Sequence, residues 1–226
     1  MHFELLVEEQ SARTALEPLL AKILGPYGEP HTWRIHKHQG KGALPVDLDA
    51  RPNPKDRSLL QNLPASLRAY GKSLVEGQAV VVLVDLDDDG DCTDFKGRLT
   101  EVLGHCQPPP TTLFRIAIEE LEAWFLGDLS AVRGAYQNAK SLILDSYVQD
   151  SVCGTWELLA DAVHPGGAKA LKTAKDYAHL EQKRLWARDI CPLMDVEANA
   201  SPSFCAFRDG LRRFAAASQG HESGQQ

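Results

Sequence analysis

Acidic side chains follow two apolar runs of this sequence, directly where each run ends. The first run closes with Val7-Glu8-Glu9, and the second closes with Val84-Asp85-Leu86-Asp87. Carboxylates held close together repel one another unless a cation offsets their charge. Mg²⁺ prefers oxygen ligands, and it often needs only one or two carboxylates beside water and a substrate phosphate. The pattern therefore predicts a site for Mg²⁺ (or Mn²⁺), with these candidate ligands: Glu8, Asp85, Asp87 and Asp89.

The apolar runs before these acids have the composition of strands in a parallel sheet. Residues 79–84 form a continuous, mostly β-branched run, which suits a central strand buried on both faces. We predict further strands over residues 3–7, 33–38 and 112–118. Ligands bind beyond the carboxyl ends of parallel strands, at a switch in strand order. Glu8, Asp85 and Asp87 stand at such ends, so we expect them to converge.

Helical periodicity occupies the segments between these strands and most of the chain after them. We predict a first helix between Ser11, its cap, and Gly25, a second over 58–74 with a candidate break at Pro64, and a third over 93–105. Strand–helix alternation over residues 1–125 predicts an α/β core, with a mostly parallel sheet of about four strands flanked by helices. Residues 126–217 are predicted to be a helical extension packed on this core. The polar, glycine-rich residues 218–226 are predicted to be a disordered tail.

The composition argues against several classes of protein. With 43% hydrophobic residues among 226, the chain has enough apolar side chains to form a core. No apolar run approaches the roughly 20 residues that span a bilayer, and the acidic N-terminus does not resemble a signal peptide. The five cysteines lack Cys-x-x-Cys spacing, which predicts neither a zinc site nor disulfides and favours a cytoplasmic, reducing compartment. The net charge of −7 argues against general nucleic-acid binding but is compatible with a local basic groove.

A strand ending in Val7-Glu8, followed far downstream by a strand ending in Asp85-Leu86-Asp87, resembles the Toprim fold. Topoisomerases, primases and OLD-family nucleases share this fold, and the match covers roughly residues 1–125. The whole chain further resembles a small bacterial family of stand-alone Toprim-like proteins, often encoded beside an ATPase of the AAA or ABC type. The segments that carry this second resemblance are Leu6-Val7-Glu8-Glu9, Gln39-Gly40-Lys41, Val84-Asp85-Leu86-Asp87-Asp88-Asp89, IAIEELEAWF at 116–125 and SFCAFR at 203–208.

The resemblance implies a metal-dependent nuclease acting on nucleic acid, foremost DNA. Glu8 would then act as general acid/base or metal ligand, while Asp85 and Asp87 would hold Mg²⁺ against the scissile phosphate. It also implies the ATPase as a partner and a role in defence against phages. Whether the chain forms a homo-oligomer is left open. Toprim domains often carry glycine after the catalytic glutamate, whereas Glu9 stands here. Glu8 and Glu9 therefore both remain candidates, and we favour Glu8.

Further acids follow the last predicted strand. Glu119 and Glu122 are three residues apart and would share one face of a helix, whereas Glu120 would point elsewhere. These two acids would complete a second metal site, as the resemblance to OLD-like nucleases implies. The alternative is that acids at a helix N-terminus only complement the helix dipole.

Two basic regions are candidates for contact with phosphates. Lys41 lies between two glycines near the expected carboxyl edge of the sheet, although a full P-loop pattern is absent. A surface connector is the alternative for this loop. Lysines spaced by three, followed by further basic residues at 183, 184 and 188, predict a basic helical stripe that tracks a nucleic-acid backbone, or else a solvated helix face. The lysines of this stripe are Lys169, Lys172 and Lys175.

Other functions fit parts of the same pattern. The run from Asp85 to Gly90 resembles the start of an EF-hand loop, but Lys96 stands where that loop needs a glutamate. A solvated acidic turn and a phosphatase with an aspartyl nucleophile are the local alternatives. At the level of the whole protein, a non-catalytic Toprim-like regulatory subunit and a metal-dependent phosphohydrolase of small phosphorylated substrates are the alternatives to a nuclease.

Overall fold

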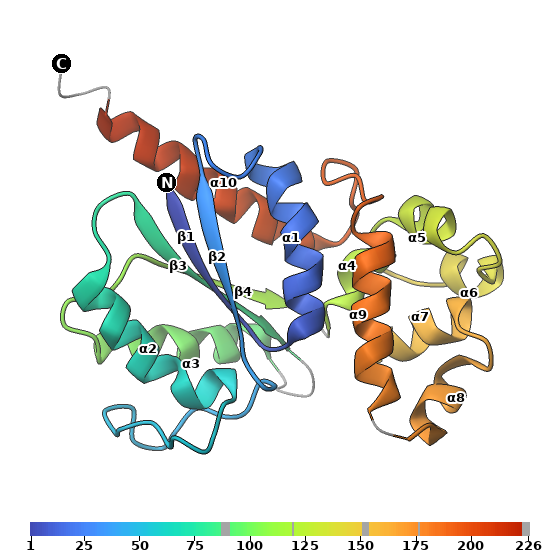
Figure 1. Ribbon diagram of the computed structural model, residues 1–226, viewed down its shortest axis with the longest axis horizontal. Coiled ribbons are helices and arrows are strands. Elements are labelled where there is room, and N and C mark those ends of the chain that lie inside the picture. The colour runs from blue at the N-terminus through green and yellow to red at the C-terminus, as the bar shows by residue number, and fades with distance from the viewer. Residues whose placement is uncertain (87–90, 119, 151–153, 176, 223–226) are drawn as a thin grey trace.

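The computed structural model describes residues 1–86, 91–118, 120–150, 154–175 and 177–222. Four strands form one sheet in the order β2-β1-β3-β4, and every pair of neighbours is parallel. The predicted α/β fold with a parallel sheet flanked by helices is confirmed (Figure 1). The strands are β1 (His2–Val7), β2 (Thr32–Lys37), β3 (Gln78–Asp85) and β4 (Thr112–Ala117).

The strand order reverses between β1 and β3. The chain passes from β1 outward to β2, returns across β1 to β3, and continues to β4 on the other side. The middle six residues of β3 are buried, as their β-branched run predicts for a strand covered on both faces. Glu8 and Asp85 thus stand at the two strand ends that flank the switch point.

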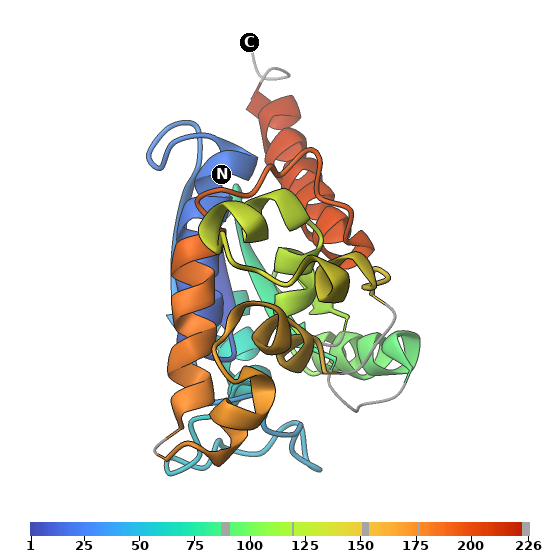
Figure 2. The ribbon, with the colours of Figure 1, turned by 90° about the vertical axis from the view of Figure 1, so that its right-hand side faces the viewer.

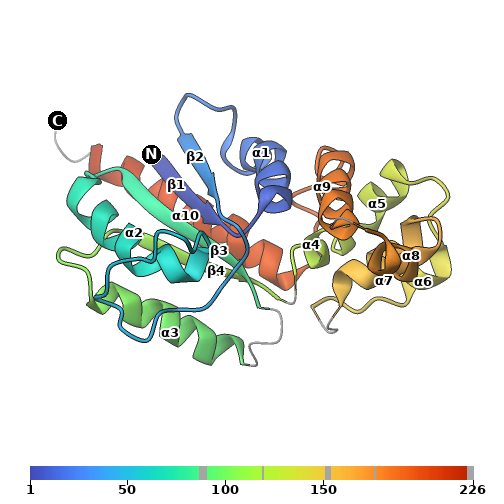
Figure 3. The same ribbon diagram turned by 60° about the horizontal axis from the view of Figure 1, so that its bottom comes forward.

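Helices cover both faces of this sheet (Figure 3). The alternation of side chains sends Leu6, Val80 and Val82 into a cluster with α2 (Leu59–Ser73) and α3 (Cys92–Gly104). Phe3, Leu5 and Val81 point to the opposite face, where they join the cluster formed with α1 (Gln10–Leu24) and α10 (Pro202–Glu222).

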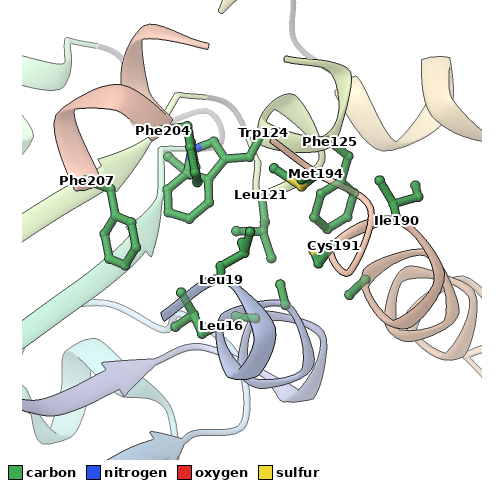
Figure 4. Packing of buried hydrophobic residues seen from close by; sticks show 14 of the residues in the cluster. Leu16, Leu19, Leu121, Trp124, Phe125, Ile190, Cys191, Met194, Phe204 and Phe207 are labelled. Atoms are coloured by element: carbon green, nitrogen blue, oxygen red, sulfur yellow. The ribbon is translucent and has the colours of Figure 1, made fainter. Parts of the chain in front are cut away.

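The helices between β4 and α10 lie beyond the end of the sheet (Figure 1), and α9 among them packs against α1 (Figure 2). Figure 4 shows their shared core, in which Leu16 and Leu19 of α1 face aromatic side chains of the α4 and α10 segments. The ammonium of Lys22 adds hydrogen bonds to the carbonyls of Pro192 and Met194, just after α9. These helices are α4 (Glu122–Leu126), α5 (Leu129–Ala135), α6 (Ser141–Asp145), α7 (Thr155–Val163), α8 (Gly167–Thr173) and α9 (Ala178–Ile190).

Three local predictions need correction. Glu9, not Ser11, is the N-cap residue of α1, and the Ser11 hydroxyl donates to the Glu9 carboxylate. Pro64 does not break α2, which continues through it to Ser73. The first amides of this helix, those of Leu59 and Leu60, donate to carbonyls of the loop at residues 40 and 41. Backbone helix α10 continues to Glu222, so residues 218–222 are not a disordered tail.

None of the helices in the described part of the chain combines the length and the apolar character needed to cross a membrane.

Candidate active site

Glu8 and Asp85 come together at the switch point of the sheet. Strands β1 and β3 are paired with Val7 opposite Leu83, so the residues that follow them lie side by side. The Oε1 atom of Glu8 accepts a hydrogen bond of 2.7 Å from the backbone N–H of Asp85. Glu8 is buried and Asp85 is partly exposed. Both acids therefore lie at the carboxyl end of the two central strands, which we call the acidic edge. Asp87, Asp89 and Glu119, which the sequence also proposes as ligands, lie outside the described residues.

The loop after β2 returns to this edge and positions Lys41. The amide of Gly40 donates to the backbone carbonyl of Glu8, and the Lys41 ammonium donates to the carbonyl of Leu86 at 2.8 Å. The same ammonium lies 5.0 Å from the ring centroid of Phe95. Gly42 has a positive φ of 65° and leaves no room for a side chain against Ser58. The sequence expectation that Lys41 lies near the carboxyl edge agrees with this placement.

On the other side of Asp85, the segment after β4 brings two glutamates to a buried lysine. The Lys183 ammonium on α9 donates to Glu120 Oε1 at 2.9 Å and lies 3.3 Å from Glu122 Oε2. Glu120 also accepts hydrogen bonds from the Thr155 hydroxyl and the Trp156 amide at the start of α7. Glu120 thereby connects the end of β4 with two helices of the second half of the chain.

Burial dominates the electrostatics of this group. Glu122 is only 1% exposed, and neither of its carboxylate oxygens has a hydrogen-bond partner among the described residues. Burial raises the pKa of the Glu122 carboxyl to about 7, against the opposing effect of the Lys183 charge. Burial alone would lower the pKa of the Lys183 ammonium. The negative charges of Glu122, Glu120, Asp85 and Glu9 instead hold it well above its usual value.

Lys183 and Glu120 are the site residues that sequence reasoning misplaced. Lys183 was assigned to a basic stripe on a solvated or phosphate-binding face, but it is buried among carboxylates. Glu120 was expected to point away from Glu122, but it precedes α4 and shares Lys183 with Glu122. A lysine next to Arg184 and five residues before Arg188 does not reveal which face of a helix is covered, so the sequence did not identify its carboxylate partners.

The lysine stripe is only partly helical. Lys169 and Lys172 lie on α8, but the helix ends at Thr173, so Lys175 does not continue its face. The prediction of three lysines on one helical face is wrong, because the short helix stops before its third member. Lys172 pairs with Glu157 of α7 at 3.0 Å.

Carboxylates are the ligand type that a hard divalent cation prefers, but the described acids do not enclose one. Among the described residues, no three carboxylate, histidine or cysteine side chains are grouped closely enough to form a metal site. Mg²⁺ needs only one or two carboxylates when water and phosphate oxygens complete its shell, and Glu8 and Asp85 supply that number. The charge of Glu122 is already partly offset by the Lys183 ammonium, which lies 3.3 Å from Glu122 Oε2.

Comparison with known proteins places this chain in a family. The model of a family described as a domain of unknown function, DUF4276, matches residues 7–212. The chain belongs to this family. The match begins one residue before Glu8 and includes Lys41, Asp85, Glu120 and Lys183, so the whole candidate site lies within the family domain. No curated protein and no solved structure matches the chain.

Proposed function

We propose that this member of the DUF4276 family is a Mg²⁺-dependent, Toprim-type nuclease that cleaves phosphodiester bonds in nucleic acid. The observation that supports the proposal most directly is the contact between Glu8 Oε1 and the Asp85 amide at the switch point of a parallel sheet. Open parallel sheets bind ligands at this place, and carboxylates that follow two neighbouring strands there are the ligand type that Mg²⁺ prefers.

In this proposal Glu8 and Asp85 hold the cation, and Asp87, two residues along the chain, joins them through the resemblance to Toprim domains. A bound Mg²⁺ would supply Lewis acidity at a phosphoryl oxygen and orient the attacking water. Glu8 is the candidate proton acceptor for that water. Its hydrogen bond to the Asp85 amide fixes the carboxylate at the strand end, so the group needs no rearrangement before it acts.

Two ammonium groups flank the acids and would counter the charge of the substrate. Lys41 is held by the Leu86 carbonyl on one side, and Lys183 is held by Glu120 and Glu122 on the other. Because Lys183 is buried, its charge acts in surroundings where water screens it weakly. Of these two groups, Lys183 is buried and paired with two glutamates, so Lys41 is the candidate for direct contact with a phosphodiester that enters this edge.

The proposal extends to a partner. The resemblance to stand-alone Toprim-like proteins implies an ATPase of the AAA or ABC type that works with this chain in defence against phages. Cleavage is therefore to be measured for the purified chain alone and together with the ATPase encoded beside it.

Substitution of the two acids tests the proposed activity. Plasmid, single-stranded DNA and RNA are incubated with the wild type, Glu8→Gln and Asp85→Asn in Mg²⁺ or Mn²⁺, and products are resolved on gels. Both variants are expected to lose cleavage by about 100-fold or more, because each removes a carboxylate that holds the cation or accepts a proton. Glu76→Gln is the matched control, since Glu76 is an exposed acid just before β3, at the opposite end of the same strand.

The outcomes separate the alternatives. Equal cleavage by the wild type and both folded variants would overturn the proposal and point to a contaminating enzyme. Turnover of mononucleotides without cleavage of polymers would favour a phosphohydrolase of small substrates. Absence of any turnover, with and without the ATPase, would favour a regulatory subunit.

A further inference from the structure

Three aromatic rings gather where α7 meets the start of α9. The rings of Trp156 and His179 lie 6.0 Å apart at an interplanar angle of 37°, and those of His179 and Tyr177 lie 6.4 Å apart at 52°. Tyr177 is 75% exposed, so its ring contributes little to the core. Trp156 and His179 are each partly exposed. We call the side chains of Trp156, Tyr177 and His179 the ring platform.

Positive charge lies directly beside the ring platform. The Lys172 ammonium is 5.5 Å from the ring centroid of Trp156, and Lys169 is exposed one turn earlier on α8. Glu157 offsets part of this charge through its 3.0 Å ion pair with Lys172. The surface therefore combines the exposed Tyr177 ring and two partly exposed rings with ammonium groups, a combination that can bind a stacked base and its phosphate.

The ring platform is connected to the candidate active site through short contacts. The Trp156 amide donates to Glu120 Oε2 at 3.1 Å, and Glu120 Oε1 accepts from Lys183. His179 and Lys183 are four residues apart on α9, so they lie on the same face about one turn, or roughly 5.4 Å, apart. Figure 3 shows α7, α8 and α9 together beyond the ends of the strands.

We infer that the ring platform stacks the bases of a single-stranded nucleic acid and leads its backbone to the acidic edge at Glu8 and Asp85. The inference rests on the proposed function for the role of that edge. A duplex buries the faces of its bases, so exposed rings beside a phosphate-binding lysine select a strand whose bases are unstacked. Tyr177 adopts a positive φ of 58°, which tyrosine rarely takes, and its ring is exposed at the surface.

Binding without cleavage provides the test. Labelled single-stranded DNA, single-stranded RNA and duplex DNA are titrated with the protein in EDTA, and fluorescence anisotropy gives each Kd. Tyr177→Asn removes the ring with a residue that tolerates positive φ, whereas Tyr177→Phe keeps the ring. Tyr27→Asn is the matched control, because Tyr27 is also an exposed ring, 64% exposed, stacked edge-on against Trp33 far from this site.

We expect the wild type to bind single strands more tightly than the duplex. Tyr177→Asn is expected to weaken single-strand binding by about 5-fold to 100-fold, while Tyr177→Phe and Tyr27→Asn bind as the wild type does. The DNA and RNA arms identify which single strand is preferred.

Two results would overturn the inference. One is equal affinity for single strands and duplex, and the other is unchanged binding in Tyr177→Asn. If either occurs while cleavage still requires Glu8 and Asp85, only the ring platform is wrong and the proposed nuclease stands. If binding depends on Tyr177 but no polymer is cleaved, the nuclease proposal fails and the binding site remains.

Discussion

The group of Lys183, Glu120 and Glu122 shows how this chain keeps three charges in its interior. Moving charges out of water costs several kcal/mol for each ion, and their attraction offsets this cost only when the pairing is close. Lys183 touches both carboxylates, and Glu120 gains two further hydrogen bonds from the start of α7. Glu122 has the poorest environment of the three, because neither of its oxygens has a hydrogen-bond partner among the described residues.

Substitution of Glu122 by glutamine should change how stability depends on pH. The pKa of this carboxyl is 4.5 for an exposed group and about 7 in the folded protein, since burial disfavours its charge. The stability that this group contributes is therefore complete below pH 4.5 and is lost as the pH rises through 7. The shift of the Glu122 pKa from 4.5 to about 7 corresponds to about 3 kcal/mol of folding free energy. The Glu122→Gln variant should lack this loss.

Urea unfolding at several pH values between 4.5 and 8 measures the difference. The free energy of unfolding of Glu122→Gln, relative to the wild type, should rise across this range. Parallel curves for the two proteins would contradict a buried carboxyl that resists ionisation.

At the scale of elements, the approach of α2 to the start of β4 depends on one glycine. A side-chain carbon at Gly71 would lie 2.0 Å from the carbonyl oxygen of Pro108, which is backbone and cannot rotate away. Gly97 stands inside α3, where nothing lies within 4 Å of the same position. The two glycines are therefore a matched pair, one required by packing and one exposed.

Alanine at these two positions should have opposite effects on stability. Gly71→Ala is expected to destabilise the protein by about 1–3 kcal/mol, because α2 must move away from the Pro108 segment. Gly97→Ala is expected to stabilise it by roughly 0.5–1 kcal/mol, because alanine loses less conformational freedom in a helix. Urea denaturation of both variants measures the difference, and equal stabilities would show that α2 lies farther from Pro108.

At the scale of the whole molecule, the candidate site depends on both halves of the chain. Glu8 and Asp85 come from the sheet, whereas Lys183 and the ring platform come from helices that follow it. These helices share a hydrophobic core with α1. The ammonium of Lys22, on α1, also donates hydrogen bonds to carbonyls just after α9. With a net charge of −7, the overall field of the chain repels a polyanion, so the proposed nucleic-acid substrate would have to be attracted by local groups.

Binding of a divalent cation should therefore stabilise the whole fold. Mg²⁺ or Mn²⁺ at 100 times its Kd should raise the free energy of unfolding of the wild type by about 2.7 kcal/mol, because only the folded chain brings Glu8 and Asp85 together. Thermal unfolding is followed with added MgCl₂ or MnCl₂ and with NaCl of equal ionic strength. The double variant Glu8→Gln/Asp85→Asn should show no shift, whereas Glu76→Gln should shift as the wild type does. A shift of equal size in the double variant would place the cation elsewhere.

Much of the sheet was predictable because its information is local. The buried β-branched run that became β3, and the acids that end β1 and β3, are read directly from neighbouring residues. The parallel order also follows, since helices separate the strands. The reading fails where a residue's neighbours in space are distant in sequence. The start of α2 is an example, because its first amides donate to carbonyls of the loop at residues 40 and 41.

By itself, the sequence determined that an α/β sheet forms and that Glu8 and Asp85 stand at the ends of strands, because strand propensity and the position of a carboxylate after an apolar run are local properties. Tertiary structure alone decided that Lys183 lies between Glu120 and Glu122. The spacing of basic residues on α9 is the same whether a side chain faces water or a buried carboxylate, and only the packing of α9 against α1 selects one of these environments.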